Sequence, residues 1–142
     1  MLEVMGGMRR QYFLTWLMLG LISIPFPALA EKRVALLIGN EAYATEIGRL
    51  ANLHNDVALL EQGLRELGFE VVVERDAGHG SLTRAVNAYA RRLQAARRNA
   101  VGFFYYSGHG ATDGSTNYLI PVDVKTTETC ELWDGSLQLT EN

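Results

Sequence analysis

The sequence has a single cysteine among its 142 residues, and its three histidines lie far apart. One cysteine cannot form an intramolecular disulfide, and scattered histidines lack the spacing of a structural zinc site, so no metal site is predicted. Basic residues are few as well, with 13 Lys and Arg against 16 Asp and Glu, and they form no long run. This balance argues against a nucleic-acid partner. The length suits one small globular domain rather than two.

The first thirty residues have the pattern of an export signal. Two arginines precede a twelve-residue apolar run, which ends at two prolines and a small-x-small motif: Arg9-Arg10, Phe13–Ile24, Pro25, Pro27 and Ala28–Ala30. An uncleaved membrane anchor is the alternative, but the run is shorter than the roughly twenty residues that a spanning helix needs. We therefore predict a signal peptide over 1–30, a mature domain over 31–142, and a periplasmic or secreted protein without membrane contact after cleavage.

The rest of the chain alternates between the periodicities of strands and helices. Apolar runs predict strands over 33–38, 69–74 and 100–106, and Tyr118–Val122 is predicted to be a short edge strand. The order strand, helix, strand, helix, strand predicts an α/β fold with a mostly parallel sheet and helices on both faces. The carboxyl ends of such strands share one edge, where function gathers. This edge is predicted to hold Gly39-Asn40, Asp76 and Ser107–Gly110.

Apolar stripes predict the two helices between these strands. The first is predicted over 56–67, with Asn55 as its N-cap and Gly68 just after its end, and Ser81 is predicted to cap the second. Four arginines follow in the last turns and beyond, at 91, 92, 97 and 98. We interpret them as a solvated helix end that complements the helix dipole, with an anion site as the alternative.

His109 is the side chain at the predicted edge that is best suited to chemistry. Glycines on both sides allow a substrate to approach closely, and an imidazole with a pKa near neutrality suits proton transfer. The residues alone allow equally an exposed turn histidine without a function. His54 and His79 lie away from the strand ends and are predicted to be surface residues.

Several spaced motifs resemble the caspase-like cysteine proteases, and in particular the bacterial metacaspase and orthocaspase group. The similarity covers about residues 33–124 and rests on Val34–Asn40 with Tyr43, Leu50, Asn55-Asp56, Leu67–Phe69, Phe104–Gly110 and Asn117–Asp123. These motifs correspond to the large-subunit half of the family. The resemblance implies a three-layer caspase-hemoglobinase-like fold that is truncated at its C-terminal side.

The resemblance also implies roles for individual residues. His109 matches the catalytic histidine, and Gly110 matches the residue whose N–H helps to hold the oxyanion. Asp56 and Ser107 match positions that line an acidic S1 pocket for Arg or Lys. The residues alone favour a helix-cap position for Asp56, and they allow equally a turn residue at Ser107. The implied function is a cysteine endopeptidase that acts on peptides or proteins after basic residues. No cofactor is expected, and the resemblance leaves calcium activation open.

The sequence departs from the family at the nucleophile. In the family the reactive cysteine follows a further strand in an Asp-x-Cys context, which this sequence does not contain. Cys130 is the sole thiol, and its acidic neighbours disfavour a thiolate, so we predict an ordinary loop cysteine there. Leu137–Leu139 is expected to begin the helix that precedes the missing strand in relatives. The chain is therefore interpreted as a fragment with half of a His–Cys dyad.

Two other functions compete with the endopeptidase. A non-catalytic caspase-like module would bind peptides or partners without cleaving them. A nucleotide-binding module is suggested by Gly108, Gly110 and Gly114, but these glycines follow the third strand and precede another strand instead of a helix. The oligomeric state is not predicted, although a sheet without its later strands would have an unpaired edge that favours self-association.

Overall fold

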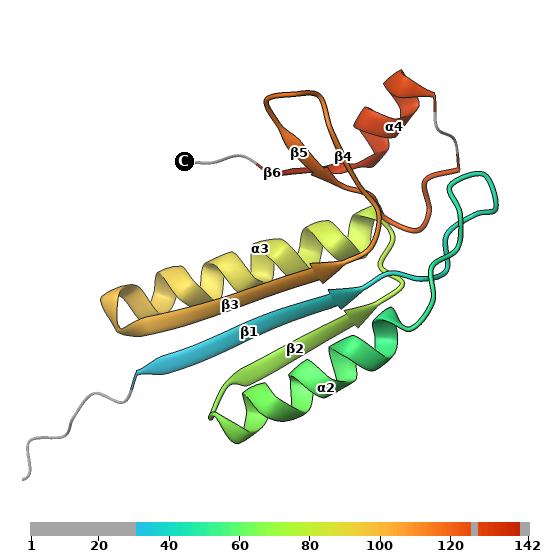
Figure 1. The fold of residues 1–142 in the computed structure, drawn as a ribbon. Coiled ribbons are helices and arrows are strands. Elements are labelled where there is room, and N and C mark those ends of the chain that lie inside the picture. The colour runs from blue at the N-terminus through green and yellow to red at the C-terminus, as the bar shows by residue number, and fades with distance from the viewer. Residues whose placement is uncertain (1–30, 126–127, 140–142) are drawn as a thin grey trace, which may run out of the picture. The chain divides into compact units, whose positions relative to one another are not determined.

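The computed structural model describes residues 31–125 and 128–139. Three parallel strands form the main sheet in the order β2–β1–β3, so the first strand lies in the centre (Figure 1). The strands are β1 (Lys32–Gly39), β2 (Glu70–Arg75) and β3 (Ala100–Ser107). Their ends differ from the predicted ends by at most one residue.

Helices cover both faces of this sheet, which gives the expected three layers (Figure 1). The helices are α2 (Leu53–Glu66) on one face, α3 (His79–Ala96) on the other, and the short 3-10 helix η2 (Arg97–Asn99) before β3. Successive side chains of β1 point to opposite faces, so Leu36 and Ile38 pack against α3, whereas Ala35 and Leu37 pack against α2. Burying each of the larger aliphatic side chains contributes about 1.5–3 kcal/mol. The central strand is apolar throughout because both of its faces are covered.

Both predicted helix starts are wrong, although Gly68 has the predicted positive φ, 80°. Helix α2 begins three residues early, after Asn52 in a left-handed conformation, and Asn55 donates its N–H to the Asn52 carbonyl from inside the helix. Helix α3 begins at His79 instead of after Ser81. The His79 N–H is satisfied by the carboxylate of Asp123, at 2.9 and 3.1 Å, so a residue far along the chain takes the capping role.

A second, antiparallel sheet follows β3, in the order β4–β5–β6. Its elements are β4 (Gly110–Thr112), β5 (Asn117–Leu119), the short helix α4 (Thr129–Gly135) and β6 (Leu137–Leu139). They lie beyond the carboxyl ends of β1 and β3 (Figure 1). Two predictions are therefore corrected. The strand expected over Tyr118–Val122 is shorter and central in its own sheet, and Leu137–Leu139 is a strand because Leu137 pairs with Leu119.

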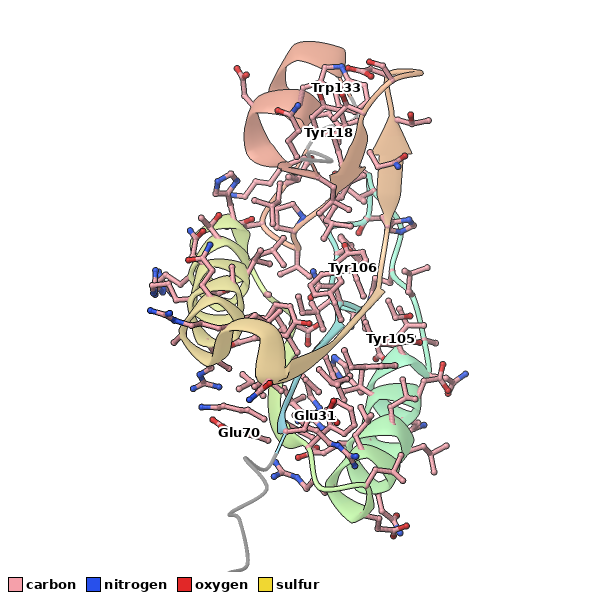
Figure 2. All side chains as sticks on the ribbon, turned by 90° about the vertical axis from the view of Figure 1, so that its left-hand side faces the viewer. Glu31, Glu70, Tyr105, Tyr106, Tyr118 and Trp133 are labelled. Carbon is pink, nitrogen blue, oxygen red and sulfur yellow. The ribbon has the colours of Figure 1, made fainter. Side chains whose placement is uncertain are left out.

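A small core joins the second sheet to the loop after β1. Tyr43, Ile120 and Val124 are its buried members. On the outside, the ring of Tyr118 on β5 contacts Trp133 of α4, with centroids 4.5 Å apart (Figure 2). The second sheet is thereby fixed above the edge at which the main strands end.

The predicted signal peptide, residues 1–30, lies outside the described residues. Among the residues that are described, no helix is both long and apolar enough to cross a membrane.

Candidate active site

The carboxyl ends of the three main strands meet at one edge, as the sequence predicted. The N–H of Asn40, just after β1, donates to the Ser107 carbonyl at 2.9 Å, and the N–H of Asp76, just after β2, donates to the Gly39 carbonyl at 3.0 Å. The fully buried Asn40 side chain adds two hydrogen bonds to Ala77. The strand ends are therefore held together by their own main chain and by one amide.

His109 lies two residues beyond β3 at this edge and is half-buried. Its Nε2 is 2.7 Å from the carbonyl oxygen of Gly48, in the loop that follows β1. A carbonyl oxygen can only accept a hydrogen bond, so Nε2 must carry the proton in the neutral ring. The lone pair of Nδ1 is then left to accept a proton from another group.

The plane of the imidazole is fixed by a second contact. The ring of Tyr43 meets the His109 ring edge-on, with centroids 4.6 Å apart and an interplanar angle of 67°. Tyr43 is only 2% exposed, so its ring is held in place by the surrounding core. The hydrogen bond at Nε2 and the contact with Tyr43 thus fix the position and the plane of the imidazole ring. Proton transfer in a defined direction needs a ring that is fixed in this way.

Gly110, the predicted oxyanion residue, follows His109 directly as the first residue of β4. It is exposed and pairs with Leu119 of β5. A hollow of about 330 Å³ lies against β4 and β5 and includes Gly110 in its lining. The structure therefore leaves open space beside the predicted oxyanion position.

Asp56 and Ser107, the predicted S1 residues, lie on the same edge. Asp56 is exposed in the first turn of α2, and Ser107 is the last residue of β3. The start of α2 packs on Gly39, where an added Cβ would lie 2.9 Å from Val57, and Gly39 pairs with Ser107 in the sheet. The end of β1 therefore lies between Ser107 and the helix turn that carries Asp56.

His54 is not the surface residue that was predicted, because α2 begins early and places it in the first helical turn. Its side chain is 30% exposed. Its Nε2 lies 3.1 Å from the Gly39 carbonyl and 3.4 Å from Asp76 Oδ2, and its N–H donates to Glu41 at 2.8 Å. His54, Glu41 and Asp76 form a polar cluster that the sequence analysis did not expect.

The carboxylate of Asp76 is held in its charged form. Burial raises its pKa, but the N–H groups of Glu41 and Ala42, which donate to Oδ1 at 2.8 and 2.9 Å, and the adjacent His54 outweigh burial. The net pKa therefore lies below the ordinary value. Asp76 and the exposed Asp56 thus place two carboxylates near this edge.

His79 and Cys130 are also placed differently from the predictions. His79 is half-buried, and its Nδ1 lies 2.8 Å from the Gly135 carbonyl, so it connects α3 to the end of α4. Cys130 belongs to α4 instead of a loop, and its side chain lies outside the described part. In that described part, no group of three His, Cys, Asp or Glu side chains could hold a metal ion.

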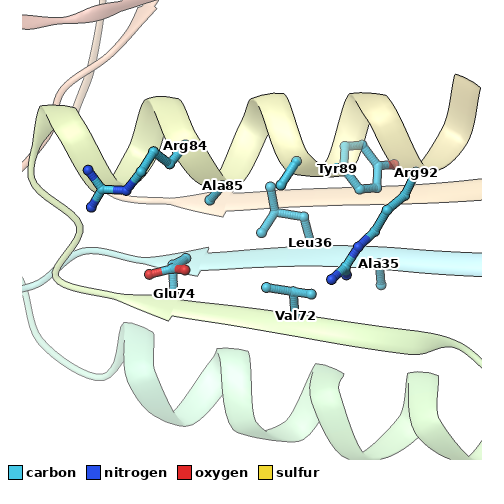
Figure 3. Close-up of a pocket in the computed structure, with 9 residues that line it drawn as sticks. Ala35, Leu36, Val72, Glu74, Arg84, Ala85, Tyr89 and Arg92 are labelled. Atoms are coloured by element: carbon cyan, nitrogen blue, oxygen red, sulfur yellow. The ribbon is translucent and has the colours of Figure 1, made fainter.

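A groove of about 220 Å³ between α3 and the β1–β2 half of the sheet contains none of the predicted site residues (Figure 3). It is lined by apolar side chains such as Leu36, Val72 and Tyr89, with Arg84 and Arg92 at its margin. The chemistry at the strand ends is therefore separate from this groove.

Gly48, Tyr43 and Asn40 contribute to the site in ways that the sequence did not predict. Gly48 has a φ of 95°, a left-handed conformation that glycine favours. A glycine in the loop after the first strand is a signal of this conformation. Nothing in its spacing indicates that its carbonyl would meet a residue 61 positions away.

Comparison with known proteins agrees with the α/β fold described above. The family described as "Caspase domain" matches residues 32–135. Mucosa-associated lymphoid tissue lymphoma translocation protein 1 from Homo sapiens and its Mus musculus homolog are both 36% identical over 95 residues, which are 67% of this chain and 11% of theirs. Metacaspase III c from Phaeodactylum tricornutum is 31% identical over 114 residues, covering 68% of this chain and 34% of the relative. The chain thus spans only a minor part of the curated relatives that it matches.

Proposed function

This chain belongs to the caspase domain family, and from that premise we propose that it is the histidine-bearing part of a cysteine endopeptidase that cleaves after Arg or Lys. The observation that carries the proposal is the 2.7 Å contact between His109 Nε2 and the Gly48 carbonyl. A histidine held in one tautomer at the edge of a parallel sheet is equipped to exchange protons with a substrate.

His109 Nδ1 is the proton acceptor in this proposal. A cysteine thiol transfers its proton to Nδ1, and the thiolate attacks the carbonyl carbon of the scissile peptide bond. The N–H of Gly110 stabilises the oxygen that becomes negative. When the C–N bond breaks, Nδ1 gives the proton to the leaving amine, and water then hydrolyses the thioester with His109 again as the base. The Gly48 carbonyl stabilises each imidazolium because it accepts from Nε2–H.

The preference for basic residues rests on the charge of the edge. Asp56 is an exposed carboxylate in the first turn of α2, and Ser107 lies one strand away. Asp76 and Glu41 add carboxylates at the same strand ends. A guanidinium or ammonium group is bound most strongly by several carboxylate and hydroxyl acceptors, so an Arg or Lys side chain complements this surface.

The proposal does not identify the cysteine that supplies the thiol. Cys130, the one thiol of this sequence, has acidic neighbours on both sides, at 128 and 131, and these disfavour a thiolate. This feature of Cys130 favours a second candidate, a caspase-like module that binds peptides without cleaving them.

Peptide cleavage by the full chain tests the two candidates. Fluorogenic peptides ending in Arg, Lys or Asp would be assayed with calcium and with a chelator. The endopeptidase predicts cleavage after Arg and Lys that His109→Ala lowers by about a hundredfold or more, the range for losing a general base. His79→Ala is the matched control, because His79 contacts α4 and not the edge.

The binding module predicts a different pattern in the same experiment. Arg- and Lys-ending peptides would bind without turnover, His109→Ala would leave their affinity unchanged, and Asp56→Asn would weaken it. Absence of both cleavage and binding would contradict both candidates.

We propose in addition that residues 1–30 direct export and are removed. The support is the arginine pair, the apolar run and the Ala28–Ala30 motif. Mass spectrometry of the protein from a cell that secretes it would find Glu31 at the N-terminus, whereas an intact leader would refute cleavage.

A further inference from the structure

Two tyrosine hydroxyls meet beneath His109. The hydroxyl of Tyr43, from the loop after β1, lies 3.1 Å from the hydroxyl of Tyr106, on β3. The His109 N–H donates to Tyr43 Oη at 3.0 Å, and Tyr106 Oη donates to the His109 carbonyl at 2.9 Å. Both main-chain polar groups of His109 are therefore bound by tyrosine hydroxyls.

We propose that Tyr43 and Tyr106 are positioning residues that hold His109 by its main chain, so that its imidazole keeps Nε2 on Gly48 and Nδ1 toward the thiol. The inference rests on the proposed function of His109. It adds a pair of tyrosine hydroxyls that no motif assigned to the reaction.

The hydrogen-bond inventory fits this role. Each hydroxyl has one proton to donate. The Tyr43 proton goes to the Ile120 carbonyl at 2.9 Å, and the Tyr106 proton is shared between the Ile120 carbonyl at 2.8 Å and the His109 carbonyl at 2.9 Å. The Ile120 N–H donates to the His109 carbonyl at 3.0 Å, which closes the network. Since Ile120 follows β5 directly, the network fastens His109 to the second sheet as well as to β3.

The hydroxyls also remain donors throughout the working pH range. Burial raises the pKa of both tyrosines, and for Tyr106 the hydrogen bond with Tyr43 raises the pKa further. Neither hydroxyl therefore ionises near neutral pH.

Gly108 allows the chain to pass close to this pair. A Cβ at Gly108 would lie 2.5 Å from Tyr43 Oη and 2.7 Å from Tyr106 Oη, closer than atoms can approach. The glycine before the histidine is thus explained by the two hydroxyls. The same close approach brings the Tyr43 ring against the imidazole.

Nuclear magnetic resonance of the full chain labelled with 15N tests the proposal without using cleavage. Tyr43→Phe and Tyr106→Phe each remove one oxygen and keep the ring. Tyr105→Phe is the matched control. Tyr105 is the neighbour of Tyr106 on β3 and packs on the α2 side of the sheet (Figure 2). Its hydroxyl has no hydrogen bond among the described residues.

We expect the wild-type His109 spectrum to show one tautomer, protonated at Nε2. Tyr43→Phe should mix the two tautomers of His109, Tyr106→Phe should act in the same direction, and Tyr105→Phe should leave the single tautomer unchanged. If both variants lower the unfolding temperature but leave the tautomer of His109 unchanged, the hydroxyls are merely structural and the proposal is overturned. Should Tyr43→Phe fail to fold, Tyr106→Phe decides alone. Loss of the endopeptidase proposal would show instead as absence of cleavage with the tautomer still fixed.

Discussion

The side chain of Asn40 makes two hydrogen bonds with the main chain of Ala77. Its Nδ2 donates to the Ala77 carbonyl at 3.2 Å, and its Oδ1 accepts from the Ala77 N–H at 2.8 Å. Both residues are buried, at 0% and 2% exposure. The Asn40 amide therefore binds both main-chain polar groups of Ala77, whose carbonyl also accepts from the Val122 N–H at 3.1 Å, and it holds the segments that follow β1 and β2 together at the candidate site.

We expect Asn40→Ala to destabilise the protein by about 1–3 kcal/mol, because it leaves the buried Ala77 N–H without a partner, while the Ala77 carbonyl keeps the Val122 N–H at 3.1 Å. Urea denaturation followed by circular dichroism would measure the loss. Asn87→Ala, at an exposed position of α3, is the control and should change the free energy of unfolding by at most about 0.5 kcal/mol. Equal effects of the two substitutions would contradict the role of the Asn40 amide.

Asp76 gives the fold an acid-sensitive contact. Its pKa in the folded protein lies below the ordinary value of 3.8, so the contact stabilises the fold fully above that value and is lost as the pH falls through the lower folded pKa. Asp76→Asn removes the charge and keeps the shape, and Asn tolerates the φ of 51° at this position.

We expect Asp76→Asn to lower stability by about 1–2 kcal/mol at pH 7, a value reduced for the partial exposure of the carboxylate. The difference from the wild type should shrink below about pH 4. Thermal unfolding across pH 2–7 would measure it, with the exposed Asp134→Asn as the control. A difference that stays constant over this range would contradict the charge-assisted contact.

The main sheet was predictable because its signal is local. Each strand is marked by its own residue pattern: β1 is an apolar run, β2 is rich in Val, and β3 is rich in aromatic residues. Such a pattern indicates a strand in a covered sheet without reference to any distant residue. The arrangement of strand ends at one edge follows from parallel topology alone, and it correctly placed Asn40 and Asp76 at the same edge as Ser107.

The predictions were wrong where a main-chain hydrogen bond of one segment is made with a residue far away in the sequence. Ser81 is a good capping residue by type, but Asp123 binds the first N–H of α3 from 44 positions away. Leu137–Leu139 becomes a strand because β5 offers it an edge. In the site itself, the partners of His109 come from Gly48, 61 positions away, and from Tyr43, 66 positions away, which no local pattern reveals.

Gly108 should not tolerate a side chain. In Gly108→Ala the new Cβ would collide with two hydroxyls that are already bound to His109 and Ile120, and we expect a loss of about 2–3 kcal/mol. Gly63→Ala is the control, because it lies within α2 with nothing within 4 Å of its added Cβ, and it should stabilise the protein by about 0.5–1 kcal/mol.

A double variant makes this test specific. Tyr43→Phe removes one of the colliding oxygens, so Gly108→Ala should cost less in the Tyr43→Phe background than in the wild type. Chemical denaturation of the four proteins of this cycle would measure the coupling. Strict additivity would contradict the collision.

The two outer strands of the main sheet, β2 and β3, differ in how well they are protected against pairing with another chain. Strand β2 carries Glu70, Glu74 and Arg75, whereas β3 carries no charge and exposes Val101 and Phe104 at 36% and 38%. Charges on an outer strand oppose pairing with another chain, and an uncharged apolar strand invites it. We therefore expect self-association through β3, which size-exclusion chromatography of residues 31–142 over a concentration series would detect.

Phe104→Lys should weaken this self-association by roughly tenfold, because a charge on β3 must be desolvated when a second chain pairs with it. Leu59→Lys is the matched control: Leu59 is 71% exposed on α2, so this substitution also replaces an exposed apolar side chain by Lys, but away from the sheet edge. If both substitutions weaken association equally, general surface hydrophobicity is the cause. A wild-type protein that stays monomeric at every concentration would refute the open edge itself, whereas a selective effect of Phe104→Lys would locate the contact on β3.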